Sequence, residues 1–410
     1  MNGGVGTGRA LNSSQVVCLA VSRGDGSIGC RVATGWVDGA VRVYSLSNEE
    51  LSGKNESLMV QTFLSESDSG DDSNMPEPLV LNGHSASAIR SISFDSRNRA
   101  RLASGSSDGA VVIWDVVEEC GLFRLLGHRG AISEVHFAHV DSSFDSLITS
   151  SLDGLVKLWD LSNQCCVQTI ASHRGQVWAS VCSIGHGIPG DPRNPGSNER
   201  SRLITGDDDG MAKVWSLEAP RVYARPQRPS GDNHEGEELG EHGDEEKLLT
   251  SCCKFMGALR LPTSAPSVNE RIAVLQMHDK YLGICHANSR TVYIYVMRDQ
   301  DEARRRKQRR ISRQRQKVKV VGGSLTDQTN DNRKRGILDD ADRGSSIADP
   351  IAETIEASDE FEFLGTATAS HKIRSFVFAP WRERGGTLQI ICSLTTNAIE
   401  AITLERSKTR

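Results

Sequence analysis

Histidine, a hydroxyl residue, aspartate and an aromatic residue recur together along this chain, and side chains of these types can pass a proton along a hydrogen-bonded chain. Each of four Asp-Gly pairs has a serine or threonine four positions before the aspartate and an aromatic residue six positions after it. In three of these units a histidine lies 24 to 36 residues before the aspartate. The sets are Thr34, Asp38 and Tyr44 without a histidine; His84, Ser104, Asp108 and Trp114; His128, Thr149, Asp153 and Trp159; and His173, Thr205, Asp209 and Trp215.

The members of one set complement each other as hydrogen-bond donors and acceptors. The aspartate can accept from the histidine ring, the ring can meet the hydroxyl, and the indole N–H, which only donates, needs that hydroxyl as its acceptor. A buried network of this kind stabilises a fold only when every member is satisfied. We therefore interpret these residues as structural, and not as a repeated catalytic triad.

Short antiparallel strands must position these sets, because each Asp-Gly pair is followed by an alternating apolar run. Asp-Gly tolerates the positive φ angles of a tight hairpin turn. Ala110 to Trp114 and Leu155 to Trp159 are two such runs. The pattern resembles the WD repeat of β-propeller proteins, so we predict an all-β fold with one four-stranded blade per unit.

Two further units keep the strand alternation without the network. In the first of them, Cys285, Ser289 and Tyr295 stand at the positions of the hydroxyl residue, the aspartate and the aromatic residue. In the second, Cys392, Thr396 and Ile402 stand at the same positions. Residues 2–8 are glycine-rich and make a poor closing strand. We predict a propeller over 16–404 with six blades of a seven-bladed ring, the last without its fourth strand. The expected blades are near 16–62, 84–126, 128–170, 173–256, 271–366 and 371–404.

The segments between strands carry the polar composition of the chain. We expect residues 1–15 to be a flexible N-terminus and residues 64–80, 185–200 and 219–247 to be disordered rim loops. Ser65 and Ser69 have an acidic residue three positions on, a phosphorylation pattern that is common by chance. A longer insertion covers 298–360.

The insertion holds a strongly basic segment. Residues 298–319 contain eleven basic and three acidic residues, so a net charge of +8 leaves −13 for the rest of a chain whose total is −5. Residues 299–320 contain no proline or glycine and predict one basic helix, without an apolar stripe that could pack on a core. Contact with nucleic-acid phosphates or a nuclear-import receptor is one interpretation, and a charged solvated helix is the other. The candidate residues are Arg304, Arg305, Arg306, Lys307, Arg309, Arg310, Arg313, Arg315, Lys317 and Lys319.

Composition and motifs exclude several other classes. No apolar run approaches 18 residues and Met1 to Ser14 has no apolar signal region, so we expect no membrane contact and no secretion. The ten cysteines include no CxxC, which favours reduced thiols without a metal site. Ser107 fits a nucleophile-elbow pattern, but it lies in a repeat whose other copies carry different residues there. We expect no enzyme activity, cofactor or small-molecule substrate.

The order of these features is more specific than the repeat alone. Residues 101–115, 121–132, 173–178 and 202–206, then Cys285-His286, the basic segment and residues 370–376 together resemble the U3 small nucleolar RNA-associated protein 12 family, also called the WD repeat-containing protein 3 family. The resemblance spans about residues 16–404. Family members have two tandem propellers and a C-terminal helical domain, and this chain resembles the first propeller without its first blade.

The resemblance implies a nucleolar scaffold of the small-subunit processome. Its implied partners are the other proteins of the UTP-B module, U3 small nucleolar RNA and pre-ribosomal RNA, and its implied role is pre-18S rRNA processing in 40S ribosome biogenesis. The alternative is a WD-repeat adaptor of another complex, such as a ubiquitin-ligase substrate receptor, which has no need of a strongly basic helix. An enzyme is the third and weakest reading.

Overall fold

The fold of this chain is described from a computed structural model. It describes residues 15–23, 28–47, 77–141, 144–183, 201–218, 222–223, 248–249, 251–259, 270–298, 302–303, 305–313, 357–379 and 388–404. The expected loop at 185–200, Ser65 and Ser69 lie outside these ranges.

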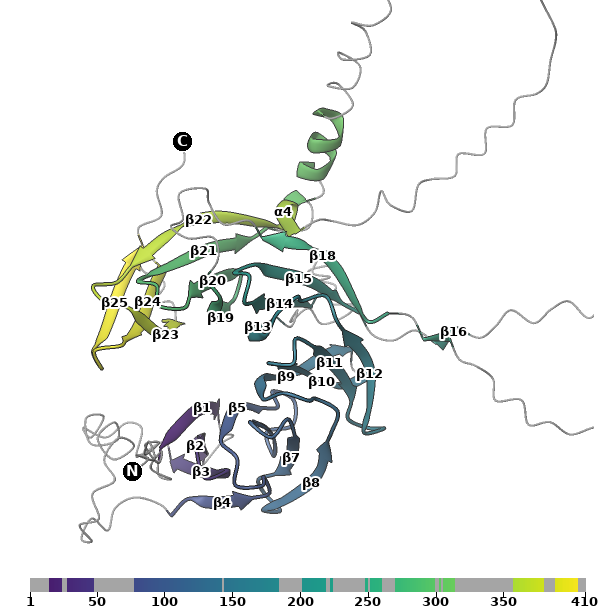
Figure 1. Ribbon diagram of the computed structural model, residues 1–410, viewed down its shortest axis with the longest axis vertical. Coiled ribbons are helices and arrows are strands. Elements are labelled where there is room, and N and C mark those ends of the chain that lie inside the picture. Colours follow the sequence, from purple (N-terminus) through teal and green to yellow (C-terminus); the bar gives the residue numbers. More distant parts are fainter. Residues whose placement is uncertain are drawn as a thin grey trace, which may run out of the picture. The chain divides into compact units, whose positions relative to one another are not determined.

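Among the described residues, six antiparallel sheets of three or four strands follow one another along the chain as the blades of a β-propeller (Figure 1). Each is made of consecutive strands apart from the fourth. Blades 1 and 2 contain β1 Val16–Arg23, β2 Ile28–Trp36, β3 Ala40–Ser47, β4 Leu79–Asn82, β5 Ile89–Phe94, β6 Arg101–Ser106, β7 Val111–Asp115 and β8 Cys120–Leu125. Blades 3 and 4 contain β9 Ile132–Asp141, β10 Phe144–Ser151, β11 Val156–Asp160, β12 Cys165–Ile170, β13 Val177–Ser183, β14 Arg202–Asp207, β15 Ala212–Leu217 and β18 Cys253–Leu259. Blades 5 and 6 contain β19 Ile272–His278, β20 Tyr281–His286, β21 Thr291–Met297, β22 Phe361–Thr368, β23 Ile373–Phe378, β24 Leu388–Leu394 and β25 Ile399–Leu404.

The Asp-Gly pairs form the hairpin turns between the second and third strands, as the sequence predicts. Gly109 and Gly154 have φ angles of 80° and 82°, which an L side chain rarely adopts. The carboxylate of Asp153 accepts the backbone N–H of Leu155 at 2.9 Å, and Asp108 does the same for Ala110. Each aspartate therefore fixes the turn that begins the third strand of its blade.

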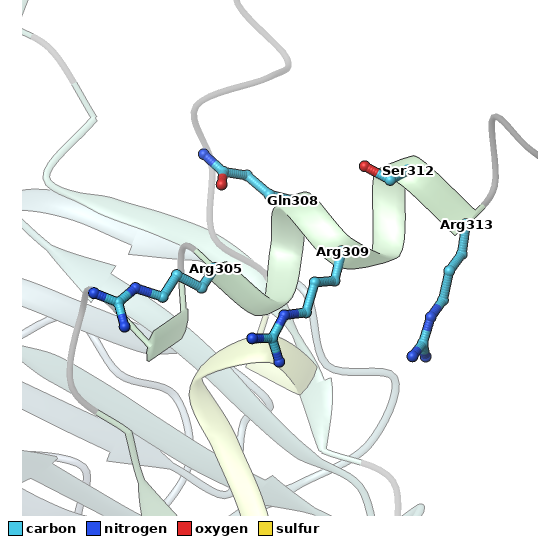
Figure 2. A pocket seen from close by; sticks show the side chains of 5 residues that line it. All are labelled: Arg305, Gln308, Arg309, Ser312 and Arg313. Atoms are coloured by element: carbon cyan, nitrogen blue, oxygen red, sulfur yellow. The ribbon is translucent and has the colours of Figure 1, made fainter.

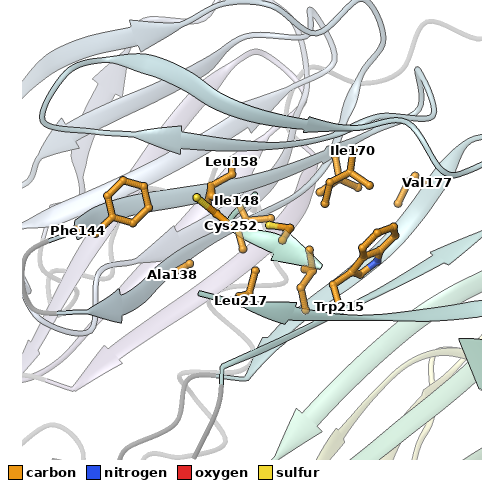
Figure 3. Close-up of a cluster of buried hydrophobic side chains, with 12 residues drawn as sticks. Ala138, Phe144, Ile148, Leu158, Ile170, Val177, Trp215, Leu217 and Cys252 are labelled. Atoms are coloured by element: carbon orange, nitrogen blue, oxygen red, sulfur yellow. The ribbon is translucent and has the colours of Figure 1, made fainter. Parts of the chain in front are cut away.

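The chain divides into two compact units, Met1–Phe255 with Ser267–Leu275 and Met256–Pro266 with Gln276–Arg410. In the first unit, the first strands β1, β5, β9 and β13 lie beside one another in chain order. The apolar clusters of this unit lie between neighbouring blades. The cluster between blades 3 and 4 joins Ile148 and Leu158 to Trp215 and Cys252 (Figure 3).

A small residue in the second strand lets the next blade approach closely. A Cβ atom added at Gly105 would lie 2.5 Å from the side chain of Ile132, the first residue of β9. Gly35 has the same relation to Ile89, and Gly283 in the second unit has it to Phe376, each with a nearest approach below 3.0 Å. A larger side chain at these positions would force the blades apart, because both faces are buried.

Blade boundaries differ from the sequence prediction at two places. Blade 1 does not end near residue 62: its fourth strand is β4, which pairs with β3 from Leu79 to Asn82, so the expected loop 64–80 ends in a strand. The expected loop 219–247 also contains part of a two-stranded sheet, β16 Val222–Tyr223 paired with β17 Leu248–Leu249. These short segments become strands because each pairs with a segment distant in the sequence. Local composition does not indicate such a partner. The seven-bladed ring stays a prediction.

Polar side chains join the first strands of neighbouring blades. The Ser91 hydroxyl of β5 donates to the Glu134 carboxylate of β9 at 3.0 Å, and the Val135 N–H donates to Ser91. Further along, His136 Nε2 lies 3.0 Å from the Ser180 carbonyl oxygen in β13. Burial raises the pKa of Glu134 to about 7, although the Ser91 hydroxyl and the Arg90 guanidinium act in the opposite direction.

Replacing Glu134 with Gln is expected to stabilise the protein above pH 7 and to have little effect at pH 4. The folded state holds the Glu134 proton to about pH 7, whereas the ordinary value is 4.5, so the folded state binds more protons between these values and wild-type stability falls as pH rises. Glutamine resembles the neutral acid and does not titrate. The difference in free energy of unfolding should grow from near zero to roughly 1–3 kcal/mol. Chemical denaturation of both proteins from pH 4 to 8 measures it, and a difference independent of pH would contradict the assignment.

Candidate functional site

The blade 3 network has the form that the sequence predicts. His128 Nδ1 lies 2.9 Å from Asp153 and its Nε2 lies 2.8 Å from the Thr149 hydroxyl, which also accepts the Trp159 indole N–H at 2.8 Å. The Arg129 backbone N–H donates to the same carboxylate. Thr149 is fully buried and His128 and Trp159 are nearly so.

Blade 4 corrects one predicted member. His173 Nδ1 pairs with Asp207 at 2.9 Å, and not with Asp209, while Thr205 bridges His173 and Trp215 as predicted. Three consecutive aspartates precede the turn glycine here, so spacing alone could not choose among them. Asp207 ends β14 and also accepts the Lys213 ammonium at 3.2 Å.

The networks of the first two blades depart further from the pattern. In blade 2, His84 and Trp114 both meet the Ser104 hydroxyl at 2.8 Å, but Asp108 lies 3.9 Å from His84 Nδ1, which is an ion-pair distance and too long for a hydrogen bond. In blade 1 the indole that donates to Thr34 belongs to Trp36, two residues along the same strand, at 2.9 Å. The sequence analysis placed the aromatic slot at Tyr44. Trp36 could have been chosen from the sequence, because a buried indole N–H needs an acceptor and Thr34 is two residues away.

The electrostatics favour neutral rings at His84 and His128 and charged carboxylates at Asp153 and Asp207. Burial lowers the pKa of His128, while Asp153 acts in the opposite direction. Burial alone would raise the pKa of Asp153, but the Arg129 N–H and His128 lower it more. In blade 4 the His173 and Lys213 hydrogen bonds outweigh burial and hold the pKa of Asp207 to about 2. In blades 3 and 4 the donors and acceptors satisfy one another inside the blade, so these sets serve the fold, whereas His84 Nδ1 of blade 2 is buried without a hydrogen-bond partner among the described residues.

The degenerate blade 5 replaces the network with aromatic packing. Cys285 and Tyr295 are buried, and the Tyr295 ring packs edge-on against Phe363 with centroids 5.5 Å apart. Ser289 makes a local turn, accepting the Thr291 N–H at 3.0 Å. Burial raises the pKa of the Cys285 thiol to about 12, so this thiol is neutral.

The predicted basic segment forms a helix in its described part, residues 302–303 and 305–313, called here the basic helix. Arg304, Arg315, Lys317 and Lys319 lie outside the described residues. The helix docks on the second unit, contrary to the expectation that it has no surface able to pack. Ala303 is 1% exposed and Lys307 9% exposed, so one side of the helix is covered.

Ion pairs hold the docked side. Arg310 Nη2 lies 3.2 Å from the buried carboxylate of Asp359, in the short helix α4 Ala357–Glu360 that precedes β22. Arg298, directly after β21, is buried and pairs with Glu362 at 2.7 Å. Its guanidinium also donates to the Asp359 carbonyl oxygen at 3.2 Å. Sequence reasoning missed this role of Arg298 and Arg310, because Asp359 lies about fifty residues further along the chain.

The opposite side of the basic helix is exposed and cationic. Arg305, Arg309 and Arg313 follow one another at intervals of four residues and extend to the same side of the helix (Figure 2). At a rise of 1.5 Å per residue, successive members of this row are about 6 Å apart along the axis. With Gln308 and Ser312 they line an open hollow. We call Arg305, Arg309 and Arg313 the arginine row.

No group of three or more potential metal ligands occurs among the residues that the structure describes. Within the same residues, no helix is both long enough and apolar enough to cross a membrane.

One protein-family profile matches two of the repeats. The profile of the WD domain, G-beta repeat, matches residues 77–115 and 120–160. Each match covers the last strand of one blade and the first three strands of the next, β4 to β7 and β8 to β11. No curated protein matches the sequence. A solved chain of "Crystal Structure of Mitotic Checkpoint Complex" is 12% identical, with a TM-score of 0.49, over 96% of this chain and 76% of that one.

The two matched WD40 repeats lie in blades 1 to 3 of a β-propeller fold with six consecutive described blades. Propellers of this type generally mediate protein–protein contacts and are generally not enzymes.

Replacing Asp153 with Ala is expected to destabilise the first unit by about 1–3 kcal/mol, because it leaves the His128 ring and the Arg129 and Leu155 N–H groups without their acceptor. The matched control is Ser289→Ala, which removes only a local turn contact and should change stability by about 0.5 kcal/mol or less. Thermal and chemical denaturation measure both. Equal losses would show that the blade 3 network does not stabilise the fold.

Proposed function

We propose that this protein is a non-enzymatic nucleolar scaffold of the small-subunit processome, within its UTP-B module. In this role it supports U3 small nucleolar RNA-dependent processing of pre-18S rRNA and 40S ribosome biogenesis. The WD-repeat propeller supplies protein-binding surfaces, and the basic helix contacts RNA. The assignment to the processome is supported by the resemblance to the U3 small nucleolar RNA-associated protein 12 family, whose features occur in the same order from the second blade to the sixth. The proposed RNA contact rests on the exposed arginine row.

The docking of the basic helix is what makes it suited to RNA. An isolated helix with this many like charges repels itself, but Arg310 is paired with Asp359 on the docked side of the helix. Arg298, which precedes the helix, is paired with Glu362. The arginine row and Arg306 remain exposed on the other sides. Arginine is always charged and matches phosphate oxygens with two N–H groups at once. Because the helix is already docked, binding a polyanion does not have to order its backbone, and the entropic cost is confined to the exposed arginine side chains.

Binding of single-stranded RNA should depend steeply on salt. Each phosphate contact releases condensed counterions, which gives a slope of about −0.7 in a log–log plot of affinity against salt. Four contacts, from Arg305, Arg306, Arg309 and Arg313, predict a slope of roughly −3. Replacing these four with Gln should flatten the slope towards zero and change the free energy of unfolding by about 0.5 kcal/mol or less, because none of them is buried.

The matched control removes the same four charges elsewhere. Arg124, Arg129, Arg174 and Arg374 are exposed on strands or turns of four blades, and their replacement with Gln should leave the slope near that of the wild type. Filter binding or fluorescence anisotropy with a short unstructured RNA between 50 and 300 mM salt measures all three proteins. Equal flattening in both variants would show that net charge alone drives binding and would contradict a site on the basic helix.

Immunoprecipitation from cells distinguishes the complexes. Recovery of U3 RNA and processome proteins is expected, and recovery of ubiquitin-ligase subunits without U3 RNA would favour the adaptor alternative.

A further inference from the structure

Ser312 lies in the basic helix, on the side turned away from the rest of the second unit. Its side chain is exposed, and it lines the same hollow as the arginine row. At 3.6 residues per turn, Ser312 is about 160° around the helix axis from Arg310, which pairs with Asp359. The docking that buries Lys307 and holds Arg310 therefore leaves the Ser312 hydroxyl open to another protein.

The residues before Ser312 have the charge pattern that basic-directed protein kinases read. Arg309 and Arg310 stand three and two positions before the serine, followed by Ile311. Such kinases pair arginines at these two places with carboxylates in their substrate groove. Arg309 is exposed, and Arg310 can exchange the Asp359 carboxylate for one of the kinase.

We infer that Ser312 is a phosphorylation site for a basic-directed serine/threonine kinase, and that its phosphate weakens the binding of RNA by the arginine row. The second half of this inference rests on the proposed RNA contact, and the first half does not. In the reaction, Ser312 Oγ forms a bond to the γ-phosphorus of ATP and the bond from that phosphorus to the ADP oxygen breaks. The kinase's catalytic aspartate takes the hydroxyl proton, and phosphoserine and ADP are the products.

The phosphate would compete with RNA for the same guanidinium groups. Phosphoserine carries about −1.5 to −2 charges at pH 7 and three strong acceptor oxygens. Arg309 and Arg305 are three and seven residues before Ser312, a spacing that places the three positions on one face of the helix. The two arginine side chains would turn from the directions drawn in Figure 2 to reach a phosphate on Ser312. Pairing with the phosphate would occupy two of the cations available to RNA. At 0.15 M salt each contact contributes about fourfold in affinity, so the loss of two predicts a decrease of about fifteenfold.

The modification is tested on the full chain with cyclic-AMP-dependent protein kinase and radiolabelled ATP. Wild type is expected to incorporate phosphate at Ser312, located by mass spectrometry, and Ser312→Ala is expected to lack it. Arg309→Gln should slow incorporation at least tenfold. The matched control, Arg305→Gln, removes the same charge from the same face but lies outside the recognised positions, so its rate should stay within twofold of the wild type. Phosphate found only at other residues, or equal rates for the two arginine variants, would overturn the site.

RNA binding by the phosphorylated protein tests the consequence. The apparent Kd should rise about fifteenfold and the magnitude of the salt slope should fall by about 1.4, corresponding to two lost contacts. Unphosphorylated Ser312→Ala should bind like the wild type, because it loses no charge. Unchanged affinity after stoichiometric phosphorylation would overturn the regulatory role. Failure of the unmodified wild type to bind RNA would instead refute the proposed RNA contact, and the phosphorylation result would stand separately.

Discussion

An indole N–H buried inside a sheet needs an acceptor, and the first four blades are arranged around that requirement. In each of them a hydroxyl on the second strand accepts the indole, from Trp36, Trp114, Trp159 or Trp215. In blades 2 to 4 the same hydroxyl also meets a histidine from the loop before the blade, which ties that loop to the sheet. A buried donor without an acceptor would destabilise the blade by the full desolvation penalty. Strand register, loop position and turn geometry therefore depend on a few shared hydroxyls.

Contacts between blades are a second constraint, because neighbouring blades must match in shape and in charge. Gly105 lets the Ile132 side chain of the next blade pack against the sheet without a clash. Arg101 bridges the same two blades electrostatically, since its guanidinium pairs with Asp95 of its own blade and reaches Asp145 of blade 3 at 2.9 Å. Apolar packing orders neighbouring sheets without specifying their register, whereas a forked guanidinium between two carboxylates accepts few arrangements. The two kinds of contact together fix one blade against the next.

The basic helix divides similar side chains between two tasks according to which way they face. Arg310 contributes to docking because Asp359 is buried opposite it, while Arg309, one residue earlier, extends into solvent. The helical periodicity of 3.6 residues makes this division unavoidable. It also places Ser312 beside the exposed cations and away from the neutralised ones. One short segment thus combines an attachment to the scaffold, a site suited to polyanions and a hydroxyl whose modification would alter that site.

The sequence by itself determined the repeat, the hairpin turns and the order of the strands, because these follow from local spacing and from the donor and acceptor inventory of each side chain. It also indicated the helix, and it placed the blade 3 network correctly down to His128, Thr149 and Asp153. Only the tertiary structure selected Asp207 among three aspartates, Trp36 in place of Tyr44, and Leu79–Asn82 as the last strand of blade 1. It also showed that Arg310 pairs with Asp359 and so attaches the basic helix to the second unit. Each of these choices depends on a partner brought close in space by folding, and residue spacing along the chain carries no distance information of that kind.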